Sequence, residues 1–65
     1  MRKVKVSLVI KSHLNDAMME MSFNPELAQT RLQFVNYLIH HYPNTEQEIM
    51  VDFVYEQFQK SLQPK

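Results

Sequence analysis

The stretch Asn24–Tyr42, NPELAQTRLQFVNYLIHHY, decides the predicted fold of this chain. Asn24 is a good helix-capping residue, and Pro25 suits the first helical turn because its φ is already fixed. Apolar residues then recur at steps of three and four, the period of one helix face: Leu27, Ala28, Leu32, Val35, Leu38, Ile39 and Tyr42. Pro43 ends the pattern, so we predict a central helix over residues 25–42.

The chain has 65 residues, which predicts one small domain over residues 1–65. So short a chain buries little surface and usually needs a disulfide, a metal or a second subunit for stability. It contains no cysteine, which excludes disulfides and thiolate metal sites, yet it is 45% hydrophobic. This combination predicts self-association, and we expect a homodimer, with a further protein partner as a second expectation.

Residues 3–11, KVKVSLVIK, alternate between apolar and polar positions, and this period of two predicts a β-strand. Its hydrogen-bonding partner is either the strand-like run near residues 47–55 or the same strand of a second chain. A helix over about 13–21 follows, with Ser12 as its cap. The alternative is a single helix over about 4–21, because Val6, Ile10, Leu14, Ala17 and Met21 also share one helical stripe.

After Pro43, Thr45 and Glu48 fit the spacing of a capping box. Apolar residues every four positions from Met50 to Leu62 then predict a helix over about 46–62, whereas the alternation over residues 48–55 is typical of a strand. The predicted fold is mainly α, with a short N-terminal strand followed by three helices. An all-α three-helix bundle is the alternative.

The central helix carries more apolar surface than one stripe requires, because Phe34 and Tyr37 lie away from it. We therefore expect a small non-enzymatic protein-interaction module that self-associates through this helix. The residues expected at the dimer or partner interface are Leu8, Leu27, Phe34, Val35, Tyr37, Leu38, Phe53 and Phe58.

The order of a basic strand, a short helix, a short connection and a longer helix over residues 3–42 resembles the ribbon-helix-helix family. In that family two chains pair their strands into a ribbon that enters the major groove of DNA. The resemblance implies that Lys3, Lys5 and Ser7 face DNA and that Asn24 lies near a phosphate. Because the formal net charge is zero, a DNA-binding transcriptional regulator is the alternative to the interaction module.

Catalytic and metal-binding patterns are weak. His13, Asp16 and Glu20 share one helix face and could ligate zinc or manganese, but a polar surface with a contact between His13 and Asp16 explains this spacing better. His40 and His41 are adjacent and point in different directions, which suits the negative end of the central helix better than a shared ion. No glycine is present for a phosphate-binding loop. We therefore expect no enzymatic activity, cofactor or metal.

No apolar run reaches the roughly 20 residues of a membrane span. The N-terminal apolar run is interrupted by Lys5 and Ser7, unlike a signal peptide. We therefore expect a cytoplasmic protein with no membrane partner.

Overall fold

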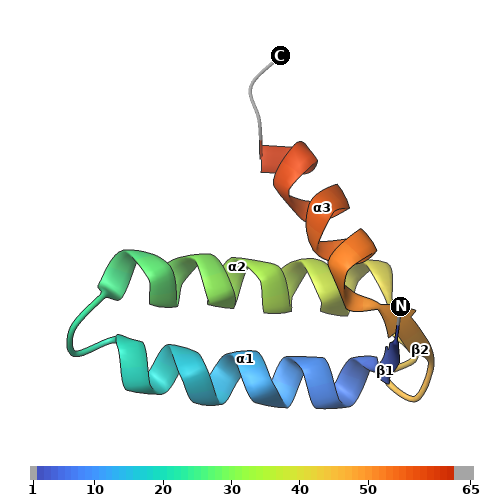
Figure 1. Cartoon of the computed structure of the whole chain (residues 1–65), viewed down its shortest axis with the longest axis horizontal. Coiled ribbons are helices and arrows are strands. Elements are labelled where there is room, and N and C mark those ends of the chain that lie inside the picture. Colours follow the sequence, from blue (N-terminus) through green and yellow to red (C-terminus); the bar gives the residue numbers. More distant parts are fainter. Residues whose placement is uncertain (1, 63–65) are drawn as a thin grey trace.

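A computed structural model describes residues 2–62, in the element order β1-α1-α2-β2-α3 (Figure 1). The two strands are β1 (Lys3–Lys5) and β2 (Glu48–Met50), and the three helices are α1 (Val6–Glu20), α2 (Pro25–His41) and α3 (Val51–Leu62). Helices α1 and α2 form an antiparallel hairpin, and α3 crosses α2 near the end where the two strands lie (Figure 1). The predicted mainly α class, with an N-terminal strand and three helices, is confirmed.

The central helix is confirmed within one residue, as α2 runs from Pro25 to His41. Asn24 is its cap, because the Asn24 Oδ1 atom accepts a hydrogen bond from the Leu27 N–H at 3.3 Å. Glu26 lies in the first turn, and His40 and His41 lie in the last turn. These charge positions match the dipole of the helix.

The N-terminal strand is shorter than predicted, since only three of residues 3–11 are extended and α1 begins at Val6. The predicted helix start near 13, with Ser12 as cap, is therefore wrong, and the alternative of one long helix is closer. β2 is only three residues long, so a longer β1 would have backbone groups without a ladder partner. As a helix, the segment satisfies these groups internally and buries Val6 and Val9.

A loop distant in sequence caps the start of α1. The Val6 N–H donates to the Gln47 carbonyl and the Ser7 N–H donates to the Thr45 carbonyl, both at 3.0 Å. Lys5, at the N-cap position, makes no side-chain cap. This contact satisfies two of the four amides that a helix start leaves without partners.

The last helix begins later than predicted, at Val51 and not near residue 46. The capping box of Thr45 and Glu48 is not formed, because Glu48 starts β2 and Asn44 organises the turn instead. The Asn44 side chain accepts from the Glu46 N–H, and its carbonyl accepts from the Gln47 N–H, each at 3.1 Å. The alternative strand over 48–55 is correct for its first three residues only.

β1 and β2 pair antiparallel within one chain, with Val4 opposite Ile49. The strand-like run near residues 47–55 is therefore the partner of the N-terminal strand. A two-chain ribbon of the ribbon-helix-helix kind needs residues 6–11 extended, and here they are helical.

The main core lies at the strand end of the hairpin, where α3 covers it. Phe34 is at its centre and is 0% exposed. Its ring centroid lies 5.0 Å from that of Tyr55 and 5.1 Å from that of Phe58, both on α3. The buried residues of this cluster are Val6, Val9, Phe34, Leu38, Ile49, Val54 and Phe58. Toward the other end of the hairpin, the buried apolar residues are Ala17 and Ala28.

Candidate functional site

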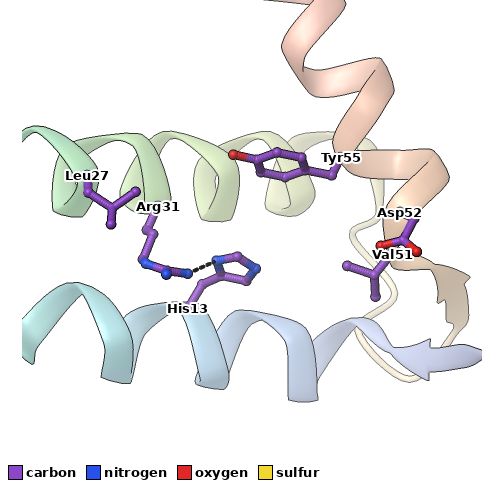
Figure 2. Close-up of a pocket in the computed structure, with 6 residues that line it drawn as sticks. All are labelled: His13, Leu27, Arg31, Val51, Asp52 and Tyr55. Atoms are coloured by element: carbon purple, nitrogen blue, oxygen red, sulfur yellow. Dashed lines mark hydrogen bonds between the residues drawn. The ribbon is translucent and has the colours of Figure 1, made fainter. Parts of the chain in front are cut away.

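An open cleft of about 330 Å³ lies between the helical hairpin and the start of α3 (Figure 2). Its lining residues are His13, Leu27, Arg31, Val51, Asp52 and Tyr55. Figure 2 shows the guanidinium of Arg31 directed from α2 toward the His13 ring on α1, with Tyr55 and Asp52 contributed by α3. The cleft thus brings together side chains from all three helices.

Arg31 joins the two helices of the hairpin through three side chains of α1. Its Nε donates to the Glu20 Oε1 at 2.5 Å, and its Nη1 donates to the His13 Nδ1 at 3.2 Å. The same Nη1 lies 3.5 Å from the Asp16 Oδ2. The hydrogen bond to Glu20 is the main cause that raises the pKa of Arg31.

The trio considered as metal ligands, His13, Asp16 and Glu20, therefore surrounds a guanidinium. Over residues 2–62, no group of three or more His, Cys, Asp or Glu side chains is placed to hold a metal ion. The helical spacing of these three residues predicts their shared face, but it does not indicate that Arg31 lies among them. The available signal was a single arginine within an otherwise uncharged stretch of the central helix, residues 27–39.

His13 is held in its neutral form by this arrangement. An arginine can only donate hydrogen bonds, so the His13 Nδ1 must accept and the ring proton resides on Nε2. Burial, and then the positive charge of Arg31, lower the pKa of His13 below its usual 6.5, while Asp16 and Glu20 oppose this shift. The ring also packs edge-on against Phe34, with centroids 4.9 Å apart.

We expect the free energy of unfolding to fall in acid through His13. Its lowered pKa means that the unfolded chain binds more protons, so this stability is complete above the unfolded pKa of 6.5 and is lost as the pH falls toward the folded value. Asp16, Glu20 and Arg31 face the ring, and Asp52 and Tyr55 line the same cleft. Urea unfolding of the protein and of His13→Asn, from about pH 7.5 to about pH 5, measures the effect.

The comparison with His13→Asn isolates His13, because His40 and His41 remain in both proteins. The parent should lose more stability than His13→Asn on acidification. Parallel pH profiles for the two proteins would show that His13 does not gain a proton on unfolding.

The second candidate is an apolar surface on the hairpin, which we call the outer face. It consists of one stripe from each helix at steps of three and four residues: Ile10, Leu14, Met18 and Met21 from α1 and its end, and Ala28, Leu32, Val35 and Ile39 from α2. Leu32 is two residues before Phe34, and Ile39 is two residues after Tyr37. Because two residues correspond to about 200° of helix rotation, both point away from the side of α2 that contacts α3.

None of the eight side chains that define the outer face is ionisable, and Glu26 borders the face near Met21 and Leu32. Met18 is 75% exposed, Met21 is 61% exposed and Ile39 is 51% exposed. Leu14 and Leu32 are also exposed. Ala28 and Val35 are buried, and Ile10 packs partly buried against the main core. Exposed apolar surfaces are a common feature of protein interfaces, so the outer face is a candidate for association.

The residues predicted for the interface are mostly in the core of the chain. Four of them are buried: Phe34, Val35, Leu38 and Phe58. The Tyr37 ring packs against the Phe58 ring, with centroids 5.5 Å apart. Leu27 lines the cleft, while Leu8 and Phe53 are exposed but lie outside the outer face. The outer face itself was not predicted. Leu32 and Ile39 were recognised only as part of the apolar stripe of the central helix, and Leu14 and Met21 only as part of a stripe over residues 4–21.

Three of the four residues that the ribbon-helix-helix resemblance placed on DNA lie together at the strand end of the chain, and the fourth lies at the other end of the hairpin. The Lys5 Nζ lies 3.2 Å from the Glu46 Oε2, and Ser7 is in α1. Asn24 caps α2 at the end of the hairpin opposite to the strands (Figure 1). Lys3, Lys5 and Ser7 line one pocket beside the carboxylates of Glu46 and Glu48, and Asn24 is not part of it.

No protein-family model matches this chain, and comparisons with curated proteins and with solved structures give no significant match. Within residues 2–62, the helices are each too short or too polar to cross a membrane.

Proposed function

We propose that this protein is a small non-enzymatic interaction module that self-associates through the outer face of its helical hairpin. The observation that carries the proposal is the distribution of apolar residues. Over residues 2–62, twelve large hydrophobic side chains are exposed, against ten buried hydrophobic residues. Five of those twelve belong to the outer face: Leu14, Met18, Met21, Leu32 and Ile39.

A second copy of this chain is the partner that the outer face fits. In a two-fold dimer the same surface meets itself, which requires that it carry no group that repels its own copy. The eight residues that define the outer face meet this condition, because none of them is ionisable. Its exposed methionines are flexible enough to pack against each other without a unique shape.

The polar cluster around Arg31 supports the non-enzymatic part of the proposal. Arg31 hydrogen bonds with Glu20 and His13, so its strongest donors are used inside the chain. This cluster joins α1 to α2 and thereby holds the outer face in shape.

Sedimentation equilibrium from about 1 µM to about 500 µM tests the proposal. We expect a dimer for the parent protein, and Leu32→Glu should weaken association at least about tenfold, because the dimer would then bury an unpaired carboxylate. Phe53→Glu is the matched control, since Phe53 is exposed on α3 outside the outer face. A monomeric parent over this range, or equal weakening by both variants, would overturn the proposal.

A further inference from the structure

The outer face has a hollow near the connection between α1 and α2. It measures about 300 Å³ and is lined by Met21, Pro25, Glu26, Ala28, Gln29 and Leu32. The small side chain of Ala28 leaves this space open between its larger neighbours. A hollow in an apolar surface is most stable when an apolar side chain of matching size fills it.

The same face carries a protruding side chain at its other end. Ile39 is 51% exposed and lies eleven residues after Ala28, which is about 17 Å along α2. Its branched side chain is of a size that the hollow can accept. The hollow and the protrusion lie on one stripe of one helix, and this arrangement is self-complementary.

We propose that two copies dock with their α2 helices antiparallel, so that Ile39 of each copy fills the hollow over Ala28 of the other. This inference rests on the self-association proposed above and specifies its geometry. A two-fold axis perpendicular to α2, midway between Ala28 and Ile39, makes both contacts with one rotation.

The charges at the rim agree with the antiparallel arrangement. Glu26 lines the hollow, and His40 follows Ile39 directly. When Ile39 enters the hollow of the second copy, His40 comes level with that copy's Glu26 along the helix axis, about 100° round α2 from Ile39. In a parallel arrangement, Glu26 would face Glu26 and His40 would face His40.

Cysteine cross-linking of the full chain tests this geometry, since the chain has no cysteine of its own. Two single variants are required, Gln29→Cys at the exposed rim of the hollow and Ile39→Cys at the protrusion. Disulfides require Cα atoms within about 7 Å. In the antiparallel dimer, the Ile39→Cys side chain meets Gln29→Cys of the second copy, whereas two identical cysteines are at least about 13 Å apart along the axis.

Oxidation of an equimolar mixture should therefore give a disulfide-linked heterodimer, and each variant alone should remain uncrosslinked. The two chains are distinguished by mass after isotope labelling of one of them, and circular dichroism confirms that each variant is folded. Sedimentation of the same samples establishes whether dimers are present before oxidation.

A disulfide in Ile39→Cys alone would indicate parallel helices and overturn the arrangement. Dimers that give no heterodisulfide in the mixture would overturn it too, while leaving self-association intact. A parent protein that stays monomeric would overturn both the arrangement and the proposed function.

Discussion

Phe34→Ala is expected to lower the free energy of unfolding by about 3–5 kcal/mol. The side chain is 0% exposed and contacts rings from both other helices: His13 on α1, and Tyr55 and Phe58 on α3. Truncation removes these contacts together and leaves a cavity that α2 cannot close, because its neighbours are held by the β1–β2 pair and by the Arg31 cluster. Urea denaturation followed by circular dichroism measures the loss.

The size of this effect approaches the whole stability expected of a 65-residue domain, about 3–10 kcal/mol. Phe34→Leu should therefore be measured as well. It keeps much of the buried volume, so it should lower the free energy of unfolding by less than Phe34→Ala. Phe53→Ala is the matched control, because Phe53 is 48% exposed and should lose well under half as much. Equal losses for Phe34→Ala and Phe53→Ala would contradict the position of the core.

The same residue shows where sequence analysis succeeds and where it stops. The period of α2 and its cap at Asn24 are local properties, so the helix was predicted within one residue. Phe34 was placed at an interface because it lies off the main apolar stripe of its helix. The crossing of α3 over α2 decides instead that Phe34 is the centre of the core, and no local pattern encodes this crossing.

The predicted start of α1, near residue 13, was wrong for a related reason. KVKVSLVIK fits a strand and a helix equally well in isolation, and its backbone finds a strand partner only in Glu48–Met50. The length of β1 is therefore set by β2, which is more than forty residues away in the sequence. The cap on α1 comes from the Thr45 and Gln47 carbonyls of the same distant segment.

The candidate surfaces were predicted in part. Excess apolar surface on a short chain without cysteines was evident from composition, and it led to the expectation of self-association. Which apolar residues are exposed depends on the side of the hairpin that α3 covers. Phe34 and Leu38 are buried, and the sequence alone did not indicate that other apolar side chains remain exposed. The Arg31 cluster was predicted in part. The helical spacing of His13, Asp16 and Glu20 indicated that they share one face, but it did not indicate that they surround Arg31.

Arg31→Met is expected to lower the free energy of unfolding by about 2–3 kcal/mol, which is more than the removal of an ordinary surface ion pair. The methionine keeps most of the apolar stem but removes the donors to Glu20 and His13. The Glu20 side chain is only 13% exposed, so its carboxylate would be left poorly hydrated and close to Asp16. Thermal and urea unfolding at neutral pH measure the change.

Lys60→Met is the matched control, because Lys60 forms an exposed pair with Glu56 at 3.5 Å and should change stability by less than about 1 kcal/mol. Adding Glu20→Gln to Arg31→Met should restore part of the loss, since the unpaired carboxylate causes much of it. The acid sensitivity should also diminish in Arg31→Met, because the positive charge that lowers the pKa of His13 is gone while Asp16 and Glu20 still raise it. A double variant no more stable than Arg31→Met alone, with an unchanged pH profile, would show that Arg31 contributes packing and not charge.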